Sequence, residues 1–157
     1  MKGRKIINLE SKFPYLTTDV PLEQSKNDIK ALLRKFKCEE ILDYESGENV
    51  RIAFKKQGIP YIIDFPVIYV EGKKTKMRPA PQIAGRIVYN KIKAVLADLT
   101  LEESDEFMQA MLRFIGIPTP QGMISLGELV EMQKDKIIKG QIEFDPQKIK
   151  LITEGRE

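Results

Sequence analysis

The sequence predicts an α+β fold: a helix, then a three-stranded antiparallel sheet, then two to three helices packed on one face of that sheet. Two observations support this prediction. Apolar residues recur with a helical period before residue 37 and after residue 81, but alternate with polar residues between residues 50 and 65. Short turn signals separate the predicted strands, and strands joined by short turns pair antiparallel.

Length and composition fit an ordinary globular protein. The chain has 157 residues, of which 42% are hydrophobic and 31% charged, enough to bury a core without disulfides. We expect an N-terminal arm over residues 1–18, one domain over residues 19–136 and a C-terminal tail over residues 137–157. The sequence has no long apolar stretch and no signal-peptide core, so we expect a cytoplasmic protein without a membrane partner.

The N-terminal part is expected to contain a short strand and the first helix. The strand is placed at residues 6–9. The helix is expected to begin near Ser25, which forms a capping-box pattern with Asp28, and Pro21 suits an additional earlier turn. One face of this helix is apolar, because four residues follow the spacing i, i+3, i+4 and i+7: Ile29, Leu32, Leu33 and Phe36.

Three strands are expected next, over residues 40–45, 50–55 and 61–65. The second and third strands alternate apolar and polar residues, and the pairs Gly47 with Asn49 and Gln57 with Gly58 mark the turns. A proline ends the third strand or places it at an edge, and residues 67–70 can extend it beyond a kink.

The second half is expected to be helical. A long helix begins near Pro81, and a capping-box pattern over residues 100–103 starts another helix, for which Gly116 is a suitable end. Residues 117–122 hold two prolines and predict a stiff turn, followed by a last helix over residues 125–136.

The residue types exclude several classes of chemistry. The chain has no histidine, which removes the commonest general base and zinc ligand, and it has no glycine-rich phosphate loop. Its one cysteine, Cys38, is interpreted as a semi-buried structural residue, since no histidine or cluster of bases can activate the thiol. We therefore expect no cofactor and no metal, and the sequence favours a non-catalytic protein.

Carboxylates are numerous, and most are interpreted as surface residues. Glu102, Glu103, Asp105 and Glu106 stand at the start of a predicted helix, where acids complement the helix dipole; a divalent-metal site is the alternative. Asp64 lies within an apolar strand, so an enzyme with a site near Asp64 is one of three functional hypotheses. An outward position on a half-exposed sheet explains Asp64 equally simply.

A basic run supports the first hypothesis, a nucleic-acid-binding protein that contacts phosphates. Four cations precede the long predicted helix, and two more lie on the polar side of that helix; together they are Lys73, Lys74, Lys76, Arg78, Arg86 and Lys93. The alternative is a solvated loop that keeps a hairpin soluble. Phe54, Tyr61 and Phe65 can stack on unpaired bases, although core packing explains their alternation as well.

The remaining hypothesis is a protein–protein adaptor or inhibitor. It predicts an exposed apolar patch that includes methionines, for which Met108, Met111, Met123 and Met132 are the candidates. The alternative is that these methionines fill gaps in the core.

Dispersed motifs resemble a known group of proteins. They are TTDVPLEQS at residues 17–25, IIDFP at residues 62–66, IPTPQG at residues 117–122 and LGE at residues 126–128. Their order resembles a family of short conserved hypothetical proteins encoded in phages, prophages and other mobile elements. The resemblance implies no catalytic residue, but such genes accompany replication, recombination and packaging genes. Residues 25–99 also resemble the double-stranded RNA-binding domain in element order, without its Gly-Pro-x-His loop.

Overall fold

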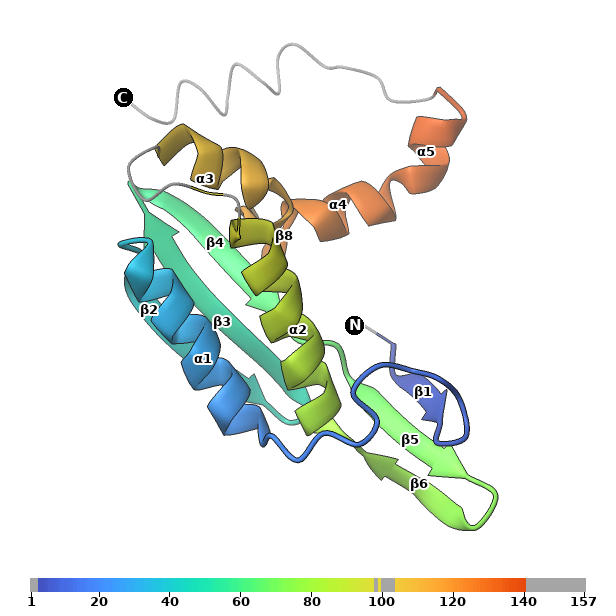
Figure 1. The fold of residues 1–157 in the computed structure, drawn as a ribbon. Helices are drawn as coiled ribbons and strands as arrows, with labels where there is room; N and C mark the ends of the chain where they lie inside the picture. Colours follow the sequence, from blue (N-terminus) through green and yellow to red (C-terminus); the bar gives the residue numbers. More distant parts are fainter. Residues whose placement is uncertain (1–2, 98, 100–103, 141–157) are drawn as a thin grey trace.

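The computed structural model describes residues 3–97, 99 and 104–140 (Figure 1). The predicted α+β class is confirmed. The predicted arrangement is wrong in one respect, because the described chain has eight strands in three sheets rather than a single three-stranded sheet. The predicted capping box at residues 100–103 and the end of the tail, residues 141–157, lie outside the described residues.

The central sheet is the predicted one. Strands β2 (Glu39–Ser46), β3 (Asn49–Lys56) and β4 (Ile59–Asp64) pair antiparallel in sequence order. Helices α1 (Leu22–Lys35) and α2 (Pro81–Leu96) lie side by side across one face of this sheet (Figure 1). The turn signals and the helical periods therefore located five elements correctly.

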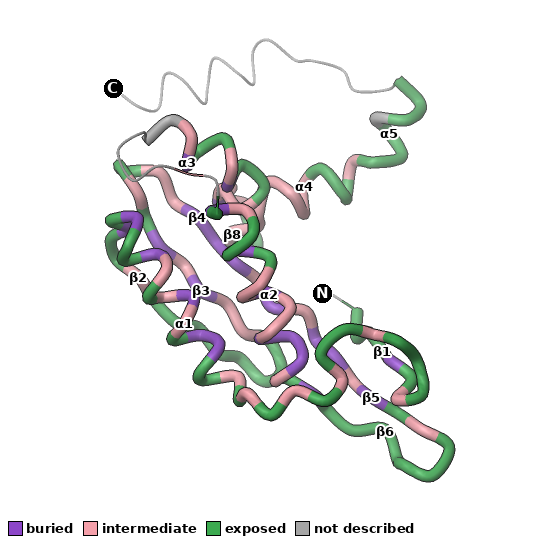
Figure 2. Tube along the Cα trace, viewed as in Figure 1, coloured by how far each residue is buried: buried purple, intermediate pink, exposed green. Residues whose placement is uncertain are grey.

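The main core lies between this sheet and the two helices. Figure 2 shows buried segments along β3 and β4, whose alternate residues face the helices. The three aromatic residues considered for base stacking belong to this core, because Phe54, Tyr61 and Phe65 are all buried. The Phe54 and Tyr61 rings are stacked with centroids 5.1 Å apart. Buried rings cannot stack on bases, so the core interpretation of these aromatics is confirmed.

The start of α1 differs from the prediction. Ser25 and Asp28 lie inside the helix, which begins after Pro21, so they do not form a capping box. Both side chains instead face α2. The two helices approach closely here, because a Cβ on Gly85 would lie 2.9 Å from the Ser25 Cβ. Only glycine fits at this crossing, which explains a glycine within a helix.

A second sheet was not predicted as such. It contains β1 (Lys5–Asn8), β5 (Ile68–Gly72) and β6 (Thr75–Pro79), with β5 in the middle. The pair of β1 and β5 is parallel, and the pair of β5 and β6 is antiparallel. The expected strand near residues 6–9 is β1. Residues 68–70 are also in a strand, but the prediction that they extend the third strand is wrong, because β5 belongs to the second sheet and not to the sheet of β4. The basic run is a strand hairpin rather than a loop.

This second sheet has a small core of its own. Ile7, Ile68 and Val70 project from β1 and β5 and pack on the first turn of α2, where Ala80, Ile83 and Ala84 are buried. Every residue of β6 is exposed. Its sequence therefore lacks the alternation of apolar and polar residues that indicates a strand with one buried face. The position of β6 is determined by its backbone pairing with β5, and a period-two pattern of side chains does not reveal such pairing.

The C-terminal part is less helical than predicted. Helix α3 (Ser104–Ala110) is followed by a short 3₁₀ helix, η1 (Leu112–Phe114), and by the hairpin of β7 (Gly116–Thr119) and β8 (Gly122–Ser125). Gly116 therefore begins a strand and does not end a helix. A Cβ there would lie 2.9 Å from the Met123 Cε, so a larger residue at this position would have to displace the end of the Met123 side chain. The predicted stiff turn is this hairpin.

The last predicted helix is observed as two segments. Helix α4 (Leu126–Met132) begins where predicted, since the Ser125 hydroxyl accepts a hydrogen bond of 3.1 Å from the Glu128 backbone N–H. Helix α5 (Lys134–Ile138) follows, and both helices extend away from the central sheet (Figure 1).

Candidate functional site

Four of the six predicted cations lie on one projecting hairpin. Strands β5 and β6 are joined by the two residues Lys73 and Lys74, and the hairpin extends beyond the body of the protein (Figure 1). Lys76 and Arg78 follow on β6, and all four side chains are exposed. The Lys73 ammonium is 3.7 Å from a Glu10 carboxylate oxygen, and both side chains are largely solvated. Such an ion pair contributes little.

The other three hairpin cations are available to a ligand. Within the part of the chain that the structure describes, Lys74, Lys76 and Arg78 have no ion-pair partner. Glu71, the acid that could neutralise this surface, is exposed on β5 in register with Asn8. Glu106, another acid that would weaken a positive surface, lies half-buried on α3 (Ser104–Ala110). Asp98, Glu102 and Glu103 lie outside the described residues, as does the side chain of Asp105.

The base of the hairpin is fixed to the body. Glu48, in the turn between β2 and β3, accepts a 2.9 Å hydrogen bond from Arg4 Nε and another from the Tyr69 hydroxyl. The Arg4 guanidinium also lies over the Tyr69 ring, 4.9 Å from its centroid. These exposed contacts link the two sheets, and the buried residues Ile68 and Val70 of β5 hold the base of the hairpin on α2.

Arg86 does not belong to this basic surface. Its guanidinium donates to the Ser25 hydroxyl at 2.8 Å and to the Asp28 carboxylate at 2.7 Å, and its side chain is 14% exposed. It also stacks over the Tyr89 ring at 4.4 Å. The ion pair lowers the pKa of Asp28 below its ordinary value, chiefly through the hydrogen bond from Arg86. Arg86 thus joins α1 to α2.

Lys93 is exposed but lies away from the hairpin. It follows the first residue of α2 by twelve positions, which is about 18 Å along a helix. Helix α2 starts at the base of the hairpin and runs away from it across the central sheet (Figure 1). The structure therefore brings together Lys73, Lys74, Lys76 and Arg78, and it separates Arg86 and Lys93 from them.

Replacing Arg86 is expected to affect stability rather than binding. Arg86→Met should lower the free energy of unfolding by about 2 kcal/mol, because the buried Ser25 hydroxyl loses the Arg86 donor and the half-buried Asp28 carboxylate loses its ion pair and keeps only the hydrogen bond from Gln24. Urea denaturation measures this loss, with the exposed Lys93→Met as the control on the same helix.

The same pair predicts a pH dependence. The pKa of Asp28 is lowered in the folded state, so its contribution is fully present above the ordinary value of 3.8 and is lost as the pH falls through the lowered value. The stability difference between the wild type and Arg86→Met should therefore shrink below about pH 4. A difference that stayed constant down to pH 2 would contradict this assignment.

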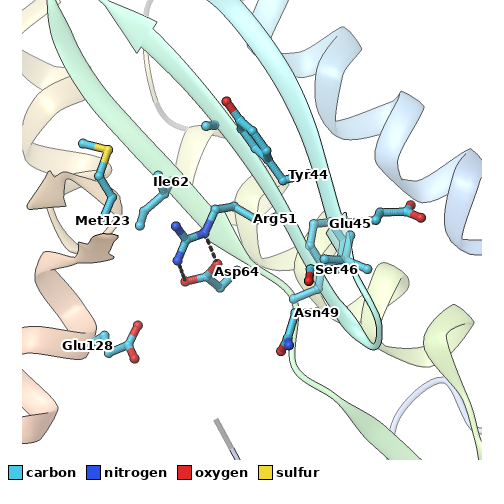
Figure 3. Close-up of a pocket in the computed structure, with 12 residues that line it drawn as sticks. Tyr44, Glu45, Ser46, Asn49, Arg51, Ile62, Asp64, Met123 and Glu128 are labelled. Carbon is cyan, nitrogen blue, oxygen red and sulfur yellow. Dashed lines mark hydrogen bonds and ion pairs between the residues drawn. The ribbon is translucent and has the colours of Figure 1, made fainter. Parts of the chain in front are cut away.

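A groove occupies the face of the central sheet opposite α1 and α2. Its volume is about 610 Å³, and Figure 3 shows Tyr44 on one side and Met123 and Glu128 on the other. On its floor Arg51 pairs side-on with Asp64, through contacts of 2.6 Å and 3.2 Å. Asp64 thus lies in a concave site, as the enzyme hypothesis required. An acid–base pair at Asp64 would need a partner that can exchange a proton, such as a lysine or a tyrosine, whereas the residue paired with it here is an arginine.

An arginine is a poor partner for proton transfer, because the guanidinium does not release its proton in proteins. The arrangement of Arg51 and Asp64 therefore fits a fixed polar contact better than an acid–base pair. The sequence contained one signal for a covered surface here. Ile62 interrupts the alternation of β4 and is 1% exposed although it lies on the groove face, which indicates that both faces of β4 are covered.

The remaining candidates have ordinary structural positions. Burial raises the pKa of the Cys38 thiol to about 11, which leaves it unreactive near neutral pH. Met111 is fully buried, Met123 lines the groove, and Met108 and Met132 are exposed on different helices, α3 and α4. Over residues 3–97, 99 and 104–140, no three acidic or thiol side chains converge as ligands of a metal ion would.

Comparisons with protein-family models, with curated proteins and with solved structures found no match. In the described part of the chain, no helix combines the length and the apolar character needed to cross a membrane.

Proposed function

We propose that this protein binds nucleic acid without catalysis, through contacts between the β5–β6 hairpin and backbone phosphates. One observation carries the proposal. Four exposed cations, Lys73, Lys74, Lys76 and Arg78, lie on a hairpin that projects from a fixed base, and three of them lack a counter-charge among the described residues.

The shape of the hairpin suits a duplex. The major groove of B-DNA, about 12 Å wide, admits a two-stranded β-ribbon. Lys76 and Arg78 are two residues apart on one strand, so their side chains leave the same face about 7 Å apart. Residues 72–79 include no asparagine or glutamine, the residue types that read adenine, so base reading by this hairpin is limited chiefly to contacts of its cations with guanine. The proposed binding is led by phosphates.

The resemblance to short proteins of phages and other mobile elements adds an association with replication, recombination and packaging. We accordingly propose an accessory role beside such machinery. The cations of the hairpin support the proposed binding of nucleic acid, whereas the proposed role beside replication, recombination or packaging machinery rests on the resemblance alone.

A salt titration of the unmodified protein tests the proposal. The anisotropy of a labelled 20-base-pair DNA duplex, and of single-stranded DNA and RNA, is measured between 50 and 300 mM salt. If the four hairpin cations each displace a counterion, log K should fall against log salt with a slope of about −3.6 for the duplex and about −2.8 for single strands. No binding at 50 mM, or binding that salt does not weaken, would overturn the proposal.

A second candidate function, a protein–protein adaptor, is favoured by a different surface. Leu42 and Tyr44 are exposed on β2 beside the groove, 51% and 53% respectively. Neighbouring apolar side chains on a sheet edge are typical of an interaction site.

A further inference from the structure

Strand β2 is an open edge of the central sheet. It pairs with β3 alone among the described residues, regularly from Leu42 to Ser46 and with an irregularity between Glu39 and Leu42. Half of its backbone N–H and C=O groups therefore point outward without a strand partner. Such an edge can receive another strand.

The two faces of β2 differ in chemistry. Leu42 and Tyr44 are in register with Ala53 and Arg51, which places them on the groove face. Asp43 and Glu45 alternate with them and face α1, where they contact Lys26 and Lys30. The strand contains four carboxylates and no cation, so it would favour a basic partner strand.

The local ion pairs leave this edge acidic. Three carboxylates, those of Glu23, Asp43 and Glu45, surround the two ammonium groups of Lys26 and Lys30, so one negative charge remains. Glu39 adds another, since it is exposed and has no ion-pair partner among the described residues.

The protein carries a strand with the complementary pattern. Strand β6 is the outer strand of the second sheet and pairs with β5 alone among the described residues. Lys76 and Arg78 share one face, and Met77, 49% exposed, alternates onto the other. On β6 the apolar Met77 lies between the cations Lys76 and Arg78, and on β2 Tyr44 lies between the acids Asp43 and Glu45. The two strands are therefore complementary in charge and in the position of the apolar side chain.

We propose that β6 of one copy adds to β2 of a second copy, so that copies associate head to tail. With Met77 opposite Tyr44 in an antiparallel pair, Lys76 faces Glu45 and Arg78 faces Asp43. A slip of one residue would place Met77 against a carboxylate, so the register is specified. Pairing β2 with β2, or β6 with β6, would oppose like charges and is disfavoured.

Head-to-tail contacts leave one free edge at each end, so they produce open chains or closed rings rather than a single symmetric dimer. The acidic edge and nucleic-acid phosphates compete for the same hairpin. That competition rests on the proposed function, whereas the pairing of the two edges does not.

Disulfide trapping tests the register directly. Tyr44→Cys and Met77→Cys are prepared separately and mixed under mild oxidation. The wild type is the negative control: its cysteine, Cys38, is buried and should not form a disulfide between copies. A disulfide between the two variants should form several-fold faster than either variant links to itself. The matched control replaces Tyr44→Cys by Ser46→Cys, which lies on the same face two residues away and forms no ion pair, and which is opposite Thr75 in the proposed register. Equal rates for the two mixtures would overturn the register.

Sedimentation separates this inference from the proposed function. The weight-average mass of the wild type should rise with concentration up to about 0.5 mM and fall again on adding salt or a short DNA duplex. Tyr44→Lys should weaken association about fivefold and leave affinity for DNA unchanged. A wild type that stays monomeric overturns the head-to-tail pairing even if it binds DNA. Association that DNA does not disperse overturns the competition alone.

Discussion

Replacing Lys73, Lys74, Lys76 and Arg78 together by alanine is expected to lower the affinity for duplex DNA about a thousandfold at 0.1 M salt. Each cation that neutralises a phosphate releases about 0.9 of a counterion, which corresponds to roughly an eightfold gain in affinity at this salt concentration. Four such contacts multiply to a factor of about 10³–10⁴. The slope of log K against log salt should become shallower by about 3.6 in the same variant.

A control variant with the same change in net charge separates a local site from a general charge effect. Arg34, Lys35, Lys136 and Lys139 are exposed on α1 and beside or within α5, away from the hairpin. Replacing these four by alanine removes the same total charge. This control should retain most of the affinity and nearly the full slope. Equal losses in the two variants would show that net charge, and not the hairpin, governs binding.

The hairpin variant should keep its fold. All four residues are exposed, and the anchoring contacts of the hairpin come from Tyr69, Glu48 and the buried face of β5. Surface substitutions away from such contacts change stability little. An unchanged denaturation midpoint would therefore assign the loss of affinity to the missing cations.

The local parts of the fold could be predicted from sequence. Turn residues at Gly47 and Gly58 take positive φ as expected, and they join the three strands of the central sheet. The apolar faces of α1 and α2 follow from the helical period. These features depend on neighbours within a few residues, which is the range over which periodicity and turn chemistry carry information.

The long-range parts could not be predicted. The parallel pair of β1 and β5 joins Lys5 to Ile68, and no turn signal can indicate two strands so far apart in sequence. The hairpin of β7 and β8 contains Pro118 and Pro120, which the sequence rules read as a break in regular structure. Pro118 is tolerated there because, among the described residues, β7 and β8 pair only with each other, so both are edge strands.

In the candidate site, too, sequence analysis grouped residues that are close in the chain and missed contacts between distant segments. The four hairpin cations were found because they are adjacent in sequence. Arg86 was assigned to the same surface because it lies on the polar side of a helix, yet its partner Asp28 is 58 residues away. The groove depends on Met123 and Glu128 approaching Arg51 and Asp64 from a different part of the chain, which a single sequence does not reveal.

The largest loss of stability is expected for Phe107→Ala. The Phe107 ring is 2% exposed and lies edge-on to Tyr61 and Phe54, with centroid distances of 5.5 Å and 6.5 Å. It also contacts Phe36, which follows α1, at 5.9 Å. Phe107 is thus the one residue of α3 through which this short helix joins the aromatic core, among the side chains of α3 that the structure describes.

Truncating such a ring removes the transfer free energy of its atoms and leaves a cavity, which together cost about 3–5 kcal/mol. Native domains of this size are stable by only about 5–15 kcal/mol, so the variant should unfold at a much lower urea concentration. The midpoint should shift without a change in the slope of the unfolding curve, because the area exposed on unfolding stays almost the same.

Met108→Ala provides the matched control, because Met108 follows Phe107 on the same helix and is 36% exposed. The control should cost no more than about 0.5 kcal/mol, since it removes few packing contacts. If Phe107→Ala were as mild as Met108→Ala, the ring would not anchor α3 to the core. A large loss for Phe107 alone would show that this ring anchors α3 to the aromatic core.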